Sequence, residues 1–180
     1  GRLPCPASPG GTGLENPTGG ACINPWNGFL PAITLGIGTI DSQGYALDSW
    51  GNRIRYAVTT QNGNAFTTNN GMKNAWVTGL SPDLRVCNSS VGITGAGITA
   101  ACAAGADLTN NAVAIIMSTG KNGGSAPQGA DEQANIAANR TFVSHTQRPA
   151  DAPQGEFDDL VVWLSPNTLY NRMISAGRLP

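Results

Sequence analysis

The chain has 180 residues, a formal net charge of −1 and only 12% charged residues. This length predicts a single globular domain spanning residues 1–180, with a substantial buried core. The near-neutral charge excludes a basic surface for nucleic acid or for an anionic membrane. The 24 Gly and 12 Pro residues make up 36 of the 180 positions, which favours many turns and loops over a helical bundle.

The four cysteines fall into two local pairs, Cys5 with Cys22 and Cys87 with Cys102. Neither spacing is typical of a zinc site, and the one histidine, His145, adds too little to complete one. An even count with Gly-rich intervening loops predicts two structural disulfides formed in an oxidising compartment. Local pairing is our prediction, although four cysteines allow two other pairings.

The N-terminal part of the chain reads as loop. Residues 1–20 are rich in Pro and Gly, and the Cys5–Cys22 pair would staple them. The apolar positions in residues 26–40 fit either a short helical turn or a buried loop, because Pro31 argues against a central strand.

A tight polar turn is predicted from Asp48 to Asn52. The Asp48 carboxylate can accept hydrogen bonds from amides two or three residues on, and Gly51 can adopt the positive φ that closes the turn. Trp50 within it has one side to bury. Apolar side chains at every second position then predict a strand over residues 53–59.

The middle of the chain alternates polar connections with short apolar runs. Residues 60–74 are predicted as a polar connection, followed by short strands at 75–78 and 84–88. Residues 111–119 form the clearest buried strand, and 118–129 read as a surface loop.

The last third predicts one or two helical turns over 132–140 and strands at 142–147 and 157–164. Ser165 is a suitable N-cap for a C-terminal amphipathic helix that ends at Gly177. The predicted fold class is therefore α+β: an antiparallel β-sheet with disulfide-pinned loops and a short C-terminal helix.

Four blocks, in this order, resemble the globular part of bacterial type IV pilin-like proteins, in particular minor pilins and type II secretion pseudopilins. The blocks are GFLPAITLG, DSWGNRIRYAV, IIMSTGKNGG and FDDLVVWLSPNTLYNRM. The residues that carry the core turn motif are Asp48, Trp50, Gly51, Asn52 and Tyr56. Those of the late strand motif are Phe157, Asp158, Asp159 and Trp163. The opening GRLPCP is similar to the point where such proteins leave a long N-terminal helix.

The resemblance implies a pilin-like antiparallel sheet against which the upper half of that helix packs. The helix itself lies outside this sequence, and we expect a truncation before Gly1. The implied function is that of a structural subunit of a type IV pilus or type II secretion pseudopilus, and not of an enzyme. Its partners would be other pilin or pseudopilin subunits and the inner-membrane assembly machinery. The location would be periplasmic or at the cell surface, with an inner-membrane anchor before assembly.

Two patterns of polar residues suggest catalysis or phosphate binding, but a structural role explains each of them better. His145 with Asp158 or Asp159 and a serine suggests a catalytic triad, but the G-x-S-x-G elbow is missing and strand alternation alone explains His145. Residues 120–124 suggest a phosphate loop, yet the leading Gly and the Ser or Thr after Lys are absent. We therefore predict no catalytic residue and no cofactor.

An acidic cluster late in the chain raises the question of calcium, because some pseudopilins hold a calcium ion in a late loop. The residues concerned are Asp131, Glu132, Asp151, Glu156, Asp158 and Asp159. Their spacing matches no EF-hand. We predict instead that Asp158 and Asp159 cap or border the last strand.

Two rivals to a filament subunit stay open. Trp26, Trp50, Trp76 and Trp163 could serve as sugar-stacking platforms, although core or subunit packing is the prediction. The first rival is a secreted or filament-tip adhesin or ligand-binding module, which a pocket rimmed by Trp76 or Phe66 would favour. The second is a secreted hydrolase dependent on His145.

Overall fold

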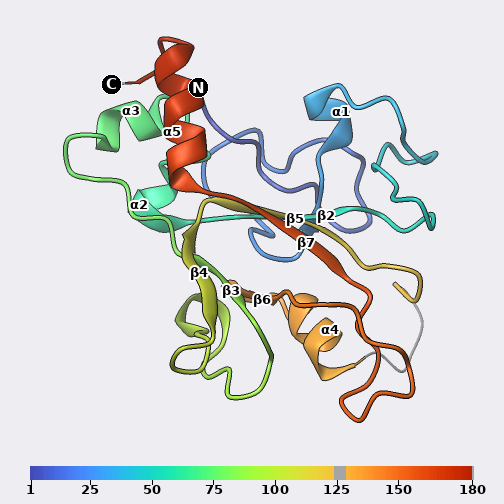
Figure 1. The fold of residues 1–180 in the computed structure, drawn as a ribbon. Helices are drawn as coiled ribbons and strands as arrows, with labels where there is room; N and C mark the ends of the chain where they lie inside the picture. The colour runs from blue at the N-terminus through green and yellow to red at the C-terminus, as the bar shows by residue number, and fades with distance from the viewer. Residues whose placement is uncertain (124–128, 180) are drawn as a thin grey trace.

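The computed structural model describes residues 1–123 and 129–179, and in these the fold is mixed α/β (Figure 1). The strands are β1 (Gly28–Phe29), β2 (Arg55–Val58), β3 (Leu84–Cys87), β4 (Asp107–Ala112), β5 (Ala114–Ser118), β6 (Thr141–Val143) and β7 (Leu160–Leu164). The helices are α1 (Ala32–Leu35), α2 (Gln61–Asn64), α3 (Gly71–Ala75), α4 (Ala130–Asn135) and α5 (Pro166–Ser175), with a 3-10 turn at Gly97–Thr99.

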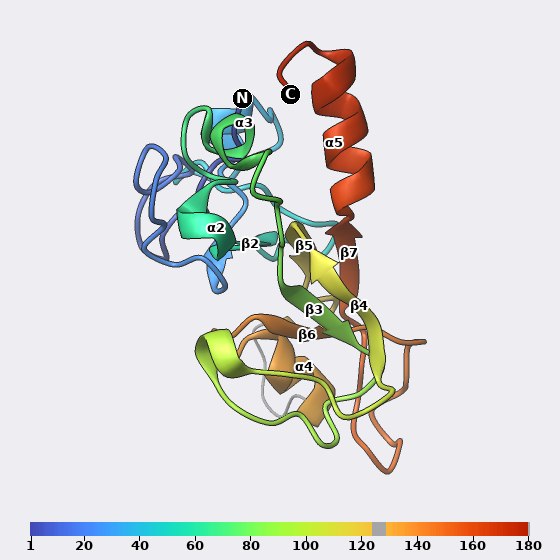
Figure 2. The ribbon, with the colours of Figure 1, turned by 90° about the vertical axis from the view of Figure 1, so that its left-hand side faces the viewer.

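The strands form a four-stranded antiparallel sheet in the order β1-β2-β5-β7 and a three-stranded sheet in the order β4-β3-β6. Only Val113 separates β4 from β5, so the chain bends there and passes from one sheet into the other (Figures 1 and 2). The Val113 side chain is fully buried beside Phe66 and Met173. The buried strand predicted for 111–119 is confirmed as β5, but residues 111–112 belong to β4 because the chain bends at Val113.

The antiparallel prediction is confirmed for the four-stranded sheet and for the β3–β4 pair, but β3 and β6 pair in parallel. Parallel neighbours need a long crossover connection. The chain between β3 and β6 provides one, because it runs through β4, β5 and α4 before it returns.

The register gives the four-stranded sheet two faces. The inner face presents Ala57, Ile115 and Met117, and these pack against Leu84, Val86 and Phe142 of the three-stranded sheet. The outer face presents Tyr56, Val58, Ala114, Ile116, Leu160, Val162 and Leu164. Leu30, Ala32 and Ala46 cover this outer face over β2, whereas Ile116, Leu160 and Val162 are exposed.

Both predicted disulfides are confirmed, Cys5–Cys22 and Cys87–Cys102. The first closes the N-terminal loop, and the second ties the end of β3 to the connection that leads into β4. Loops of this length are each stabilised by about 3 kcal/mol on a chain-entropy model. The two bridges therefore hold long segments that have little regular structure of their own.

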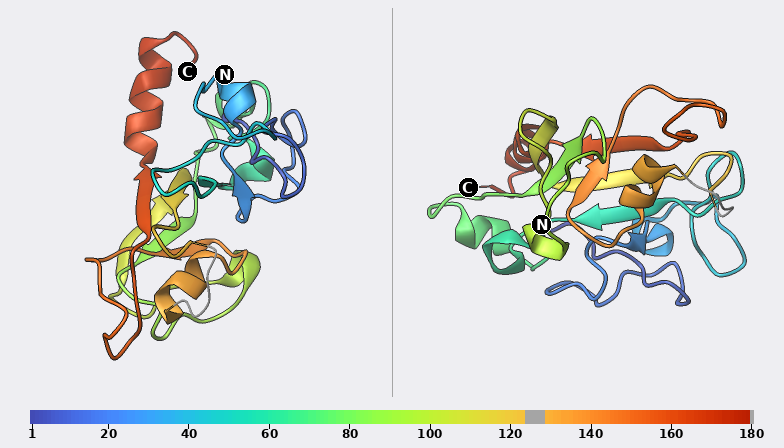
Figure 3. Two further views of the ribbon diagram at one scale, coloured as in Figure 1. Left: turned by 90° about the vertical axis from the view of Figure 1, so that its right-hand side faces the viewer. Right: turned by 90° about the horizontal axis from the view of Figure 1, so that it is seen from below.

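The C-terminal helix is confirmed. The Ser165 hydroxyl accepts a hydrogen bond from the Thr168 amide at 3.2 Å, and Gly177 adopts a φ of 64° after the last turn. α5 extends past the end of β7 (Figures 2 and 3), and the two chain termini lie at this end of the molecule. Gly1 lies against Met173 of α5. Within the described residues no helix has the length and apolar character needed to span a bilayer.

The strand predicted at 75–78 is wrong. The polar connection predicted at 60–74 contains α2 and α3, and residues 76–78 follow α3 as a turn. Tertiary packing overrides the local β-propensity here. The Trp76 ring meets Tyr170 of α5 edge-on at 5.3 Å, and Met72 is buried beneath them.

Three later elements are shorter than predicted. The helix of 132–140 is α4, which ends at Asn135, and the strand of 142–147 is β6, which ends at Val143. The strand of 157–164 begins only at Leu160, because Phe157 pairs with Arg148 in an isolated bridge. Residues 124–128 of the predicted 118–129 loop lie outside the described residues.

Gly13 sets how closely the N-terminal loop approaches the rest of the chain. A Cβ at this position would lie 1.6 Å from the Gly44 carbonyl oxygen, which is backbone and cannot swing away. We expect Gly13→Ala to lower the free energy of unfolding by about 3 kcal/mol, at the upper end of overpacking effects. Urea denaturation measures this. Gly38→Ala is the control, because a Cβ there meets nothing within 4 Å; equal stability of the two variants would contradict the packing.

Candidate functional site

The predicted turn around Trp50 is confirmed, although the Asp48 carboxylate accepts from amides two and four residues on, where two or three were predicted. Asp48 Oδ1 accepts from the amides of Trp50 at 2.9 Å and Asn52 at 2.8 Å, and Gly51 has a φ of 85°. The Ser118 hydroxyl donates to Asp48 Oδ2 at 2.6 Å, which fastens the turn to the end of β5. These bonds fix the turn to the four-stranded sheet, so it moves with the sheet as one body.

The fold gives the four tryptophans different surroundings. Trp26 packs against the core of the inner face, and Trp76 packs on Tyr170. Trp163 on β7 is partly exposed, and Trp50 is 47% exposed. Trp50 therefore does not pack in the core, and the other part of the prediction for it, packing against another subunit, stays a prediction. The hydrogen bonds of the turn are made to backbone amides, and the indole of Trp50 remains partly exposed to solvent.

The acidic cluster organises the loop after β5. Asp158 Oδ2 accepts from the amides of Lys121 at 2.7 Å and Asn122 at 3.2 Å. The buried Glu132 carboxylate accepts from the Asp158 amide at 3.0 Å and from the Asn122 side chain at 3.1 Å. These two carboxylates therefore accept hydrogen bonds from backbone amides close to β7. Residues 120–123, the described part of the stretch considered as a phosphate loop, fold around the Asp158 carboxylate.

Glu132, Asp158 and Asp159 are the residues that could hold a cation. One oxygen from each lies within 4.8 Å of the others. Burial, together with repulsion from Glu132 and Asp158, raises the pKa of Asp159 to about 7, although a hydrogen bond from Asn135 at 2.7 Å opposes this rise. A divalent cation at this point would favour the charged form of Asp159. Asp151 is exposed, and Asp131 takes part in a separate contact.

His145 contacts neither Asp158 nor Asp159 by hydrogen bond or ion pair within the described chain. Its Nε2 lies 2.9 Å from Asp131 Oδ2, and its Nδ1 lies 2.6 Å from the Thr146 carbonyl oxygen. Arg148 donates to the same Asp131 oxygen at 2.6 Å, and the Ser90 amide donates to its other oxygen at 2.6 Å. Burial raises the pKa of Asp131, but these hydrogen bonds outweigh it and hold the pKa well below its usual range.

Through these contacts Asp131 links three segments of the chain. It joins α4 to the connection after β3 and to the segment between β6 and β7. The His145 ring also stacks on Phe157 at 3.9 Å. Both ring nitrogens therefore have structural partners, and strand alternation is not what places this histidine.

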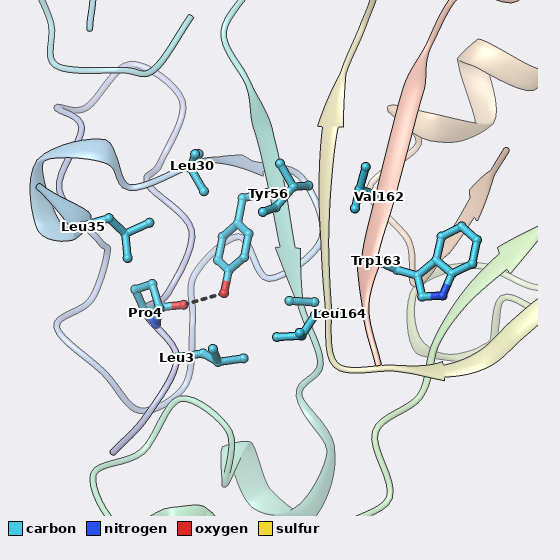
Figure 4. Close-up of a pocket in the computed structure, with 10 residues that line it drawn as sticks. Leu3, Pro4, Leu30, Leu35, Tyr56, Val162, Trp163 and Leu164 are labelled. Carbon is cyan, nitrogen blue, oxygen red and sulfur yellow. Dashed lines mark hydrogen bonds between the residues drawn. The ribbon is translucent and has the colours of Figure 1, made fainter. Parts of the chain in front are cut away.

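An open apolar groove lies on the outer face of the four-stranded sheet (Figure 4). Its volume is about 310 Å³, and every residue that lines it is uncharged. Tyr56 lies between Leu30 and Leu35 on one side and Val162 on the other (Figure 4). Ala114 and Ile116 of β5 also line the groove, because the register puts them on the same face as Tyr56. The Tyr56 hydroxyl donates to the Pro4 carbonyl at 3.3 Å, which closes one end. Trp163 borders the groove with its indole turned away (Figure 4).

The start of the chain helps to form this groove. Leu3 and Pro4 line it, and they are held in place because Arg2 forms a 2.6 Å ion pair with Glu15. The Leu3 amide also donates to the Phe66 carbonyl at 2.8 Å. The hydrogen bonds from Arg2 lower the pKa of Glu15, so this ion pair stays charged at neutral pH. Phe66 itself is fully buried, so it cannot rim the ligand pocket that would have favoured the adhesin rival.

Sequence reasoning identified the strands of the groove but not the groove. The available signal is the run of Leu160 to Leu164, in which all five residues are apolar. Such a run is typical of a strand buried on both faces. β7 is instead an edge strand, and apolar side chains on its outer face are exposed in the described fold. It therefore carries more apolar side chains than this fold buries. No family model matches the chain, and no curated protein or solved structure is significantly similar to it.

The raised pKa of Asp159 predicts a pH-dependent stability. The folded protein keeps this proton up to pH about 7, whereas the unfolded carboxyl loses it near pH 4. The folded state therefore binds more protons in this window, and its stability falls as the pH rises from 5 to about 8. The full shift corresponds to at most about 4 kcal/mol. Urea denaturation across this range should show the loss in the wild type and a much flatter profile in Asp159→Asn.

The exposed Asp151 supplies the control for this experiment. Asp151→Asn makes the same chemical change outside the buried cluster and should follow the wild-type profile. If Asp159→Asn loses as much stability with rising pH as the wild type does, the buried carboxyl is not the cause.

Proposed function

We propose that this chain is the globular domain of a filament subunit, a minor pilin or pseudopilin of a type IV pilus or type II secretion pseudopilus. The observation that carries the proposal is the apolar groove on the outer face of the four-stranded sheet. Val162 at its edge is 65% exposed and Ile116, which also lines it, is 44% exposed. Contiguous exposed apolar surface of this kind marks a site that another segment or protein covers.

A helix fits the shape of this surface. The five residues of β7 span about 15 Å at roughly 3.3 Å per residue. A helix rising 1.5 Å per residue would cover that length with about ten residues, or nearly three turns. A groove with only apolar lining offers such a helix hydrophobic contact and no charged partner, which suits one apolar stripe of a long helix.

The proposed helix would join the domain close to the groove. The ion pair to Glu15 and the hydrogen bond to Phe66 fix the start of the chain at Arg2 and Leu3. Because Leu3 and Pro4 line the groove, a helix that ended just before Gly1 would meet the domain two residues before this lining. In the filament reading its other half anchors in the inner membrane and then packs in the filament core, among other subunits.

The remaining features agree with this proposal. The two disulfides are consistent with an oxidising periplasmic or extracellular location. The four sequence blocks that resemble pilin-like proteins fall on the elements around the groove: β1 and α1, the Trp50 turn with β2, β5 with its loop, and β7 with α5. The domain would determine which subunits can pack beside it and would form part of the filament surface. It would catalyse no reaction.

The test is a charge placed on the outer face in the full-length protein in its native host. Val162→Asp puts a carboxylate where the helix is proposed to lie, and burying it there would cost several kcal/mol, on the order of a hundredfold or more in an equilibrium. We expect the variant domain to keep its thermal stability, because the side chain is exposed, and we expect at least about a tenfold loss of subunit from sheared filaments.

Leu108→Asp is the matched control, since Leu108 is a strand residue that is 50% exposed on β4 of the other sheet. It should leave assembly unchanged. Normal incorporation of Val162→Asp, measured by quantitative blotting of the sheared fraction, would contradict the proposal.

A further inference from the structure

The turn that carries Trp50 is among the most firmly held parts of the surface. Asp48 binds two of its amides and is itself bound by Ser118, and the Asn52 side chain donates to the Gly120 carbonyl at 2.6 Å. These contacts link the turn to β5 and to the loop that follows it. The backbone of Trp50 is therefore held in place, while almost half of the residue's surface faces solvent.

Packing gives no reason for this placement. Among residues 1–123 and 129–179, Trp50 belongs to none of the buried clusters and stacks on no other ring. A large, half-exposed aromatic ring on a firmly held turn, at the border of a pocket, is a candidate for contact with a ligand.

A shallow pocket of about 430 Å³ lies beside the indole. This volume is within the range of about 300–1,000 Å³ that is usual for small-ligand sites. The polar residues that line it with Trp50 are Lys121, Gln147, Arg148, Glu156 and Asp158. They come from three separate segments: the loop after β5, the segment after β6 and the segment before β7.

Charged groups of both signs line this pocket. Lys121 and Arg148 are the cations, Glu156 and Asp158 are the carboxylates, and Arg148 also forms an ion pair with Asp131 at 2.6 Å. A phosphate or sulfate group would need an excess of positive charge, which this set does not provide. The mixture of signs favours a ligand that is polar and carries no net charge.

The polar groups are also fixed before any ligand arrives. Asp158 is held by the amides of Lys121 and Asn122, Glu156 accepts from the Asn122 side chain at 3.1 Å, and Arg148 is held by Asp131. Groups that are already ordered lose little side-chain entropy when they bind.

From these observations we propose that the pocket beside Trp50 binds a neutral saccharide. One face of a pyranose ring consists of C–H groups that pack on an indole. Its ring hydroxyls are paired donors and acceptors, which planar carboxylate, guanidinium and amide groups can bind two at a time. Trp50 supplies the first kind of surface, and Gln147, Arg148 and Glu156 supply the second. Asp158 has a structural role, because its Oδ1 is buried and its Oδ2 accepts from two amides. The proposal stands on its own observations and does not depend on the filament proposal.

The experiment is a titration of the ¹⁵N-labelled chain followed by two-dimensional NMR. Maltose, cellobiose, lactose and N,N′-diacetylchitobiose are the probes, each added to about 50 mM, well above the roughly millimolar Kd expected for a shallow open site. Sorbitol, an open-chain polyol without a ring face, is the control. At least one disaccharide should shift the Trp50 indole N–H and the Lys121 amide saturably, and sorbitol should not.

Three variants decide what the shifts mean. Trp50→Ala should raise the Kd at least about tenfold, and Gln147→Ala, at an exposed position where folding is spared, should raise it at least about threefold. Trp163→Ala, at another exposed tryptophan outside this pocket, should leave the Kd unchanged. The proposal is overturned if none of the four disaccharides gives a saturable shift, if sorbitol gives the same shifts, or if both pocket variants bind as the wild type does.

Discussion

A sheet whose strands are apolar on both sides has to be covered on both sides, and the rest of the structure depends on how this is done. β5 and β7 carry apolar side chains toward both faces. The three-stranded sheet covers the inner face, and the bend at Val113 lets one continuous stretch serve both sheets. The outer face is covered by N-terminal residues over β2 only. The groove that remains is what the proposed helix would fill.

Carboxylate side chains hold many of the loops in place through hydrogen bonds, a role that regular secondary structure has in other folds. Asp48 forms the Trp50 turn, Asp158 and Glu132 fold the loop after β5, and Asp131 joins three segments. Hydrogen bonds from backbone amides to charged acceptors are roughly twice as strong as neutral ones. A chain with many loops and few charges can therefore hold its surface rigid, provided that each carboxylate has its amides. Asp159 is the exception, because its burial favours the protonated form.

Local chemistry made part of this structure predictable. The Asp48 turn, both disulfides and the capped C-terminal helix depend on neighbouring residues, and each was predicted correctly. The failures are non-local. Residues 75–78 have strand propensity, but Trp76 among them packs on Tyr170. The parallel pairing of β3 with β6 depends on a crossover that periodicity does not encode. The groove was missed for the same reason, because exposure of β7 depends on which strands are its neighbours.

The measurement that tests the central claim most directly is the intact mass and N-terminal sequence of the native protein, taken from the membrane and sheared-filament fractions. We predict a helical segment of roughly 30 residues or more before Gly1, of which about 20 apolar residues would cross a bilayer and about ten more would continue along the outer face. A native protein that is free in the medium and begins at Gly1 would contradict it. The groove would then need a different occupant.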